Sequence, residues 1–390
     1  MAVITVLAQY YHPAFNAGGP VPGIRNAVRS LSGHSVRVVT RDRDLGNAAP
    51  FGQPYVGTTV VDEAEVTYLP PLSVATSRRW LRSASRVLGG DAVYVNSLFS
   101  TYFAVLPLLM LFATRYRGRV AIAPRGELAQ SARVLGRSGR KRVWLAVIRG
   151  LRLDRSAGRR GNVVWLASST AEQRDIALMF PRATVYVSPE TLRSTASGGP
   201  IVERPRGDEL ELVCVARLAP VKGVLDLFEG LSRVTVPVRL RLVGPPEDLD
   251  YVSQLKSVEK RFPAAVRVSW LGGLPADEVS AELRASDFSV LLSRGENFGH
   301  SIGESLLEGC PVLISDQTPW SFVAEQNAGF VLAEGECRDP ERVARRIEAM
   351  AAMSGTDRIE MARAARRCGE AGLVSPGSVT VGEALGYGSA

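Results

Sequence analysis

Cysteine and histidine are scarce in this chain, which has four cysteines and three histidines among 390 residues. Cys214, Cys310, Cys337 and Cys368 lie far apart and form no C-x-x-C pair, and no histidine stands at metal-ligand spacing from them. This pattern excludes a disulfide framework and a zinc site of the usual spacing, so no metal is expected. Such cysteine usage is typical of a cytoplasmic protein.

Long hydrophobic runs are also few. The N-terminal stretch "MAVITVLAQYYHP" lacks the basic leader of a secretion signal and is typical of a first buried strand, so we expect a cytoplasmic location. The run from Leu98 to Ala113 is shorter than the ~20 residues that span a bilayer, and it contains Ser100, Thr101 and Pro107. It predicts a buried helix rather than a membrane span.

Acidic residues are nearly missing between Arg115 and Arg160, where 14 Lys and Arg stand against two Asp and Glu, net +12 compared with +8 for the whole chain. Charge gathered in one segment favours an anionic partner. The stretch "GRKRVWLAVIRGLRLDR" predicts either a helix that lies on anionic phospholipid or a core helix with a basic outer face. Its apolar residues are Trp144, Leu145, Val147, Ile148, Leu151 and Leu153.

Strand-length apolar runs such as "AVITVLA", "SVRVVT", "LELVCVARL" and "FSVLLS" alternate with helix-like segments along most of the chain. This alternation predicts an α/β fold of doubly wound parallel sheets. The pattern stops between Pro189 and Glu209, so we expect a linker there, with one domain over residues 1–200 and a second over residues 201–370. Residues 371–390 form a tail that either crosses back to the first domain or is disordered.

Ligands of open α/β sheets bind beyond the carboxyl ends of the strands, so the loops there are the candidate sites. After the first strand, Gly18 and Gly19 precede a helix. Glycine lets a backbone approach a ligand, and a helix N-terminus suits phosphate. A turn that needs positive φ is the alternative. His12, in the same loop, is either a ligand contact or an ordinary loop residue.

Two cations bracket the first strand-to-helix turn of the second domain, in "VARLAPVKG". Arg217 follows the strand, and Lys222 precedes the helix beside Gly223. At the carboxyl edge of a sheet this pair could hold a diphosphate through charge-assisted hydrogen bonds. Solvated surface cations are the alternative.

Two glutamates stand eight positions apart in "RGENFGHSIGESLLEG". Phe298 and Gly299 favour a tight helix start, which places Glu296 in the loop and Glu304 near the second helical turn. A helix start beside cations holds phosphate, whereas carboxylates accept hydrogen bonds from hydroxyls, so the pattern predicts a nucleotide-sugar ligand. The alternatives are an ordinary acidic first turn and a His300–Glu304 pair on one helix face.

These residues resemble a family 4 retaining glycosyltransferase of the GT-B fold, with "ENFGHSIGE" as the E-x(7)-E motif and "RLAPVKG" as the Arg/Lys pair. The resemblance covers nearly the whole chain. "GGP" after the first strand and "PRGEL" from Pro124 to Leu128 stand where a bacterial envelope and exopolysaccharide branch has them. The resemblance implies two Rossmann-like domains that face each other across a cleft, the first binding the acceptor and the second the nucleotide sugar.

The resemblance also implies roles for the site residues. Arg217 and Lys222 would neutralise the donor diphosphate, Glu304 would bind the ribose, and Glu296 would hold hydroxyls of the transferred sugar. Backbone N–H groups would contact phosphate and sugar at Phe298, Gly299, His300 and Ser301. From the first domain, Gly18 and Gly19 would close against the diphosphate.

The implied reaction is transfer of a hexose-type sugar with retention of its anomeric configuration. It needs no metal and no cofactor beyond the nucleotide-sugar co-substrate, with a UDP-sugar favoured over a GDP-sugar. The implied acceptor is a saccharide or lipid-linked saccharide in polysaccharide, lipopolysaccharide or glycolipid biosynthesis. The segment from Arg115 to Arg160 would then provide peripheral contact with the inner face of the membrane.

The chain departs from the family pattern at two places. Arg125 in "PRGEL" stands where many relatives have a histidine; an arginine cannot exchange protons but can hold an anionic donor or acceptor. "VSPETLRS" replaces the usual asparagine-glycine turn between the domains. A D-x-D pair, Asp42 and Asp44, is similar to the metal site of the other large glycosyltransferase fold, although a loop of alternating charges is the plainer interpretation.

Two other functions remain open at this stage. The same fold hosts nucleotide-sugar 2-epimerases, but the sequence offers no set of carboxylates for exchange of a carbon-bound proton. A non-enzymatic protein that binds anions or nucleic acid is the other alternative. No nucleic-acid partner is expected, because the basic segment contains only Tyr116 and Trp144 as aromatics and no nucleic-acid motif.

Overall fold

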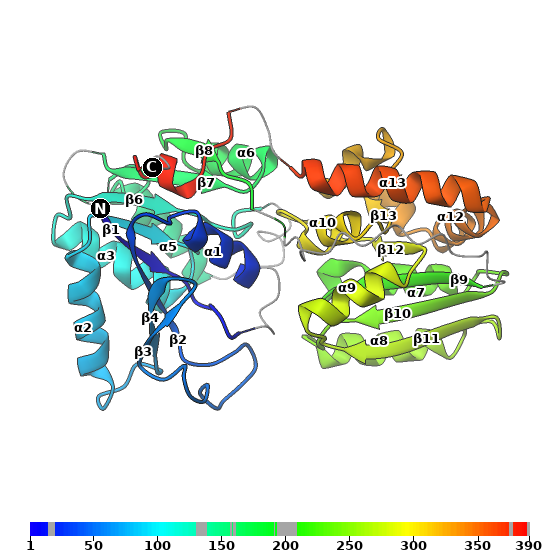
Figure 1. Cartoon of the computed structure of the whole chain (residues 1–390), viewed down its shortest axis with the longest axis horizontal. Coiled ribbons are helices and arrows are strands. Elements are labelled where there is room, and N and C mark those ends of the chain that lie inside the picture. The colour runs from blue at the N-terminus through cyan, green and yellow to red at the C-terminus, as the bar shows by residue number, and fades with distance from the viewer. Residues whose placement is uncertain are drawn as a thin grey trace. The chain divides into compact units, whose positions relative to one another are not determined.

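The chain forms two compact units in the computed structural model (Figure 1). The structure describes residues 1–14, 20–129, 139–156, 158, 161–190, 192, 209–373 and 377–387. One unit comprises Met1–Thr191 together with Val374–Ala390, and the other comprises Leu192–Leu373. The predicted linker lies largely outside the described residues.

The N-terminal unit is built on a sheet of eight strands in the order β3-β4-β2-β1-β5-β6-β7-β8. Every neighbouring pair is parallel except β3 and β4, which form an antiparallel hairpin at one edge. The strands are β1 (Val3–Leu7), β2 (Ser35–Arg41), β3 (Thr58–Val61), β4 (Ala64–Leu69), β5 (Ala92–Val95), β6 (Arg119–Ile122), β7 (Val163–Ala167) and β8 (Val185–Val187).

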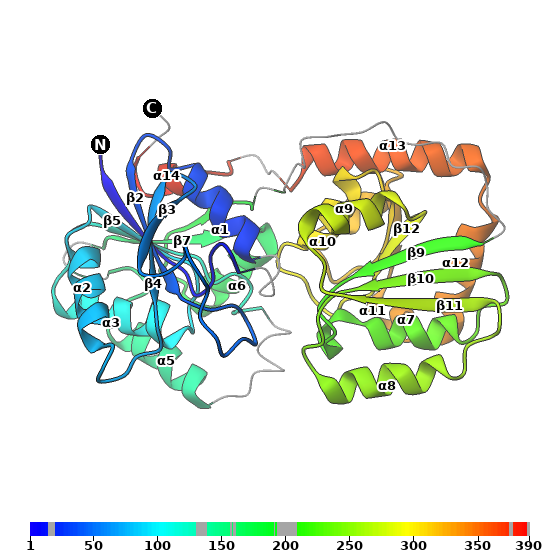
Figure 2. The ribbon, with the colours of Figure 1, turned by 60° about the horizontal axis from the view of Figure 1, so that its bottom comes forward.

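Helices cover both faces of this sheet (Figure 2). One face carries α1 (Pro20–Arg29) and α14 (Val381–Ala384); the other carries α2 (Ser77–Leu88), the π-helical turn η1 (Thr101–Val105), α3 (Leu106–Ala113), α5 (Gly139–Gly150) and α6 (Thr170–Met179). Successive strand residues point to opposite faces. Val6 accordingly packs with α1, whereas Leu7 packs in the cluster of α3 and α5.

The apolar run from Leu98 to Ala113 forms η1 and α3 against the sheet. Phe103, Leu108 and Leu111 are buried there among strand residues. None of the helices in the described part of the chain has the length and hydrophobicity that a membrane span requires.

The second unit has a wholly parallel sheet in the order β11-β10-β9-β12-β13-β14. The strands are β9 (Leu210–Val215), β10 (Val238–Val243), β11 (Val266–Gly272), β12 (Phe288–Leu291), β13 (Val312–Ser315) and β14 (Gly329–Leu332). On one face lie α7 (Val224–Leu231), α8 (Leu249–Glu259), α11 (Glu334–Cys337) and α12 (Pro340–Ala352). On the other lie α9 (Ala276–Arg284), α10 (His300–Leu307) and α13 (Gly355–Ala371). Two 3₁₀ turns, η2 (Pro220–Lys222) and η3 (Ser321–Ala324), complete the unit.

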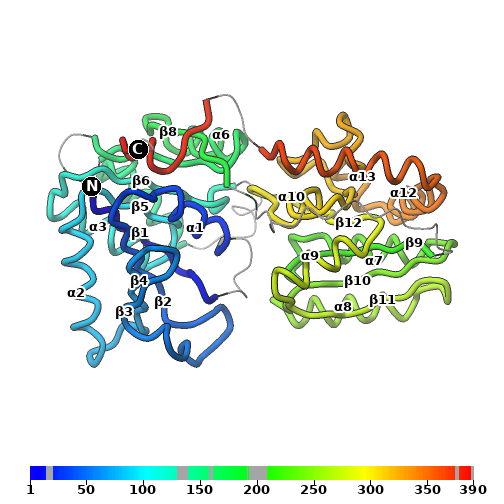
Figure 3. The backbone as a smooth tube through the Cα atoms, viewed as in Figure 1, coloured from blue at the N-terminus to red at the C-terminus, as the bar shows by residue number. Residues whose placement is uncertain are grey.

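The C-terminal segment returns to the N-terminal unit, beside β8 in Figure 3. The Val379 N–H donates to the Val187 carbonyl at 2.9 Å. Val381, Ala384 and Leu385 are buried in the hydrophobic cluster that also contains residues of α1. The predicted class, α/β with two Rossmann-like parallel-sheet domains, is confirmed.

Candidate functional site

The two predicted cations lie at the carboxyl edge of the second sheet, in the turn that joins β9 to α7. Gly223 ends η2 with a φ of +67°, a conformation that favours glycine. A Cβ there would lie 1.9 Å from the Leu292 carbonyl oxygen, just after β12. The turn therefore needs glycine, and this close approach fixes Lys222 beside the loop that follows β12.

That loop brings Glu296 to Lys222. The Lys222 Nζ lies 2.7 Å from the Glu296 Oε1, and both side chains are mostly buried. Backbone hydrogen bonds hold the loop on both sides, because Arg294 N–H donates to the Val221 carbonyl at 2.8 Å and Glu296 N–H to the Gln317 carbonyl at 3.1 Å. The structure thus joins two residues that the sequence placed in separate motifs.

The start of α10 is closely packed against its own unit. Gly299 is its N-cap with a φ of +78°, and an added Cβ would lie 3.1 Å from both Ile302 and Trp320 side-chain atoms. The Trp320 indole N–H donates to the Phe298 carbonyl at 2.6 Å, and the buried Phe298 ring lies 4.8 Å from the His300 ring. The first N–H groups of a helix have no partner within it, so His300 and Ser301 present theirs at this end.

Glu304 lies in the second turn of α10 and is partly buried. Ser305 beside it is turned inward, where its hydroxyl donates to the Ser301 carbonyl at 2.7 Å. One sheet edge therefore gathers two cations, two carboxylates and a helix N-terminus. This combination can hold a phosphate and hydroxyl groups in one ligand.

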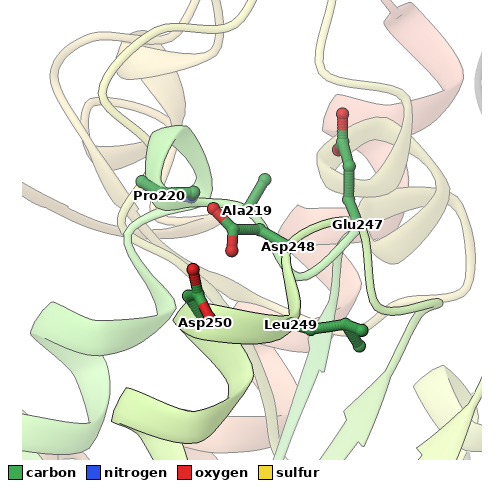
Figure 4. A pocket seen from close by; sticks show the side chains of 6 residues that line it. All are labelled: Ala219, Pro220, Glu247, Asp248, Leu249 and Asp250. Atoms are coloured by element: carbon green, nitrogen blue, oxygen red, sulfur yellow. The ribbon is translucent and has the colours of Figure 1, made fainter.

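Arg217 is paired with Glu247, a residue that sequence reasoning missed. Its Nη1 lies 2.5 Å from the Glu247 Oε2, and both side chains are exposed. Glu247 also lines an open pocket of about 550 Å³ next to η2 (Figure 4). The pocket is lined by Ala219, Pro220, Glu247, Asp248, Leu249 and Asp250. The position of Glu247 just beyond β10, at the same sheet edge as Arg217, is the signal that could have found it.

In the N-terminal unit, Gly18 and Gly19 lie outside the described residues. The His12 ring Nε2 and the Tyr55 hydroxyl form a hydrogen bond of 3.0 Å, while the His12 carbonyl accepts from the Tyr68 hydroxyl. Both partners belong to the same unit as His12.

Asp42 and Asp44 have local partners. Asp42 accepts from Arg43 at 2.8 Å, and Asp44 accepts from the Leu45 N–H at 2.7 Å. Among the described residues, no three His, Cys, Asp or Glu side chains are grouped to hold a metal ion.

Arg125 is the centre of a buried polar network beyond β5, β6, β7 and β8. Its φ is +54°, and its guanidinium donates 2.5–3.0 Å hydrogen bonds to the side chains of Tyr94, Asn96, Ser168 and Glu190. Burial alone would lower the pKa of Arg125, but the Glu190 carboxylate raises it above its usual range. All four partners of the guanidinium belong to its own unit.

Glu190 was missed by sequence reasoning, although it belongs to the segment that replaces the asparagine-glycine turn. Its Oε1 lies 2.9 Å from the Arg125 Nη1, with side chains 6% and 13% exposed. A Cβ on Gly23 would lie 1.9 Å from its Oε2, so the carboxylate rests against the first turns of α1. The two departures from the family pattern therefore meet in one ion pair.

The helix predicted in the basic segment is α5, and much of its apolar side faces the core. Residues 130–138, 157, 159 and 160 of this segment are not among the residues that the structure describes. Trp144, Ile148 and Leu153 are buried, and the Trp144 indole donates to the Leu98 carbonyl at 2.8 Å. Val143 and several arginines remain exposed. This agrees with the core helix with a basic outer face.

Residues 200–368 match the family model described as "Glycosyl transferases group 1". A trehalose synthase of Pyrococcus horikoshii is 33% identical over 108 residues, which are 25% of this chain and about a quarter (26%) of that protein.

Two solved structures share the fold over nearly their whole length. HepE from Anabaena, in complex with UDP and glucose, has a TM-score of 0.69 and 17% identity, with 96% of each chain covered. WaaG, a glycosyltransferase involved in lipopolysaccharide biosynthesis, has a TM-score of 0.67 and 16% identity, with 98% of each chain covered. At these identities the likeness establishes the fold, the GT-B type that the sequence predicted.

Proposed function

We propose that this chain is a glycosyltransferase that transfers a hexose-type sugar from a nucleotide sugar, with retention of the anomeric configuration and without a metal. The family match over residues 200–368 and the GT-B fold support the proposal. The observation that carries the proposal is the cluster at the second sheet's carboxyl edge, where Lys222 lies 2.7 Å from Glu296 beside the N-terminus of α10. A UDP-sugar is the favoured donor, supported by the similar HepE structure with UDP and glucose.

In this proposal, the cations stabilise the leaving diphosphate. Arg217 and Lys222 bind its oxygens, and the first N–H groups of α10 add partial positive charge. Glu304 binds the ribose and Glu296 the sugar hydroxyls, so neither glutamate exchanges a proton. The acceptor hydroxyl attacks on the face that the diphosphate vacates, and a phosphate oxygen takes its proton. Fixed charge of this kind is worth about 10²–10³ in rate per contact.

The proposed acceptor is a saccharide or lipid-linked saccharide of polysaccharide, lipopolysaccharide or glycolipid biosynthesis. The similarity to WaaG and the basic segment Arg115 to Arg160 support it. We place the enzyme in the cytoplasm, in peripheral contact with the inner face of the membrane. Arg125 serves as a structural support in this scheme, because its guanidinium already binds Glu190 and three further side chains.

A thermal-shift screen tests donor binding. UDP-sugars are expected to raise the melting temperature of the wild type, and Glu304→Gln should lose most of that rise because the amide binds ribose hydroxyls less strongly than a carboxylate. Glu229→Gln is the matched control, since Glu229 pairs with Arg261 at 2.6 Å in the same unit and outside the site. A Glu304→Gln variant with the full shift would contradict the assigned role.

A further inference from the structure

Two buried serines stand at the carboxyl edge of the second sheet, in the loops around the Lys222–Glu296 pair. Ser293 follows β12 and Ser315 ends β13, and each is only 1% exposed. A buried hydroxyl costs free energy unless it is hydrogen-bonded. The partners of these two hydroxyls therefore show what the serines hold together.

The Ser293 hydroxyl joins the loop after β12 to the turn after β9. It lies within hydrogen-bond distance of two carbonyl oxygens, that of Val221 at 3.1 Å and that of Gly295 at 3.2 Å. The Gly295 N–H donates back to the Ser293 hydroxyl oxygen at 3.4 Å. Val221 directly precedes Lys222, and Gly295 directly precedes Glu296. One buried side chain thus contacts the backbone beside both members of the pair.

The Ser315 hydroxyl adds the loop after β13 to this arrangement. It donates to the Ser293 carbonyl, and its oxygen accepts from the Gln317 N–H at 3.3 Å. The Gln317 carbonyl in turn accepts from the Glu296 N–H at 3.1 Å. Because β9, β12 and β13 are neighbours in the sheet, one chain of hydrogen bonds runs from η2 through both serines to Glu296.

We propose that Ser293 and Ser315 are positioning residues for sugar transfer, which hold Lys222 and Glu296 in place before the donor binds. The inference rests on the proposed function, in which these two side chains contact the diphosphate and the transferred sugar. Groups that are already in place need no reorganisation when charge develops on the leaving phosphate. Their alignment is therefore expected to act mainly on kcat.

The contacts assigned to the nucleotide have a different support. Glu304 lies on α10, and the start of this helix is held by Trp320, whose indole N–H donates to the Phe298 carbonyl at 2.6 Å. Variants of the two serines are therefore expected to bind UDP as well as the wild type does, while they turn over a UDP-sugar slowly. A serine that served only the stability of the fold would not separate these two quantities.

Kinetics and UDP binding of the full-length variants test the proposal, with the UDP-sugar that gives the largest thermal shift as the donor. Ser293→Ala and Ser315→Ala should each lower kcat roughly tenfold, as the loss of one buried hydrogen bond predicts, with the Kd of UDP unchanged. Ser289→Ala is the matched control, since Ser289 is a buried serine within β12 itself. It should leave both quantities as in the wild type.

A double-mutant cycle shows whether Ser315 acts through Glu296. In a Glu296→Ala background, Ser315→Ala should lower kcat much less than in the wild type, because the carboxylate that it positions is already gone. An equal loss of kcat in both backgrounds would overturn the proposal. So would a loss of UDP affinity that matches the loss of kcat.

Hydrogen exchange separates failure of this inference from failure of the proposed function. Peptides that span residues 293–297 should exchange roughly tenfold faster in Ser315→Ala than in the wild type or in Ser289→Ala, because the loop loses a buried hydrogen bond. Faster exchange, together with a wild type that turns over no UDP-sugar, would contradict the proposed function alone. Unchanged exchange in an active enzyme would contradict the positioning role alone.

Discussion

Single residues carry the candidate chemistry, and their partners decide what each can do. Lys222 and Arg217 each have a carboxylate partner, Glu296 at 2.7 Å and Glu247 at 2.5 Å. The first pair is mostly buried and holds Glu296 in a fixed position. The second pair is exposed, and exposed ion pairs contribute about 0–1 kcal/mol to stability. A diphosphate can therefore replace Glu247 as the partner of Arg217 with little loss of free energy.

The sequence could predict Arg217, Lys222 and Glu296 because each stands in a short local pattern just after a strand. It could not predict that Arg125 pairs with Glu190, because the two residues are 65 positions apart and meet only when β6, β7 and β8 align. The expectation that Arg125 could hold a ligand came from position alone, without knowledge of its four side-chain partners.

The pair yields a prediction about stability. Arg125→Met is expected to cost about 3–5 kcal/mol of unfolding free energy, because it leaves the buried Glu190 carboxylate without its cation. Adding Glu190→Gln should recover a large part of the lost unfolding free energy. Urea unfolding of the two single variants and the double variant measures the effect. Purely additive losses would show that the two residues act independently.

At the scale of elements, a tight hairpin holds α1 in place. Asp62, in the turn between β3 and β4, has a φ of +50° and accepts two hydrogen bonds from Arg25, one from Arg29 and one from Tyr11, all within 3.1 Å. Burial alone would raise the pKa of Asp62, but hydrogen bonds from Arg25 and Arg29 hold it below its ordinary value of 3.8. The loop predicted to bind phosphate, with Gly18 and Gly19, lies outside the described residues, so what Asp62 anchors in the structure is α1 itself.

When a carboxylate has a lower pKa in the folded state than in the unfolded state, its charge stabilises the fold. This stabilisation is present at pH values above the unfolded-state pKa and is lost as the pH falls toward the folded-state pKa. Asp62→Asn should therefore cost on the order of 1–3 kcal/mol at pH 7, and much less well below pH 3.8. Asparagine tolerates the positive φ, so the backbone is kept. Melting temperatures across this range measure the effect.

Glu65→Gln is the control for this experiment, because Glu65 and Arg86 form an exposed pair whose loss should change little at any pH. If the melting temperatures of wild type and Asp62→Asn differed by the same amount from pH 7 to pH 3, the assigned charge of Asp62 would be contradicted.

At the scale of the whole molecule, the strand and helix alternation was predictable because parallel strands buried on both faces read as continuous apolar runs. The position of the tail could not be predicted from helical periodicity, because α14 has only four residues. Tertiary contacts hold the tail in place. The Val379 N–H donates a hydrogen bond to the Val187 carbonyl, and Val381 packs among residues of β1 and α1.

The central claim, retaining transfer from a nucleotide sugar, is tested most directly by product analysis. Purified protein is incubated with UDP-sugars and a saccharide acceptor in the presence of a chelator, and the product is examined by NMR. The account predicts a glycoside with the anomeric configuration of the donor. An inverted glycoside, a requirement for metal, or an epimerised nucleotide sugar formed without acceptor would contradict it.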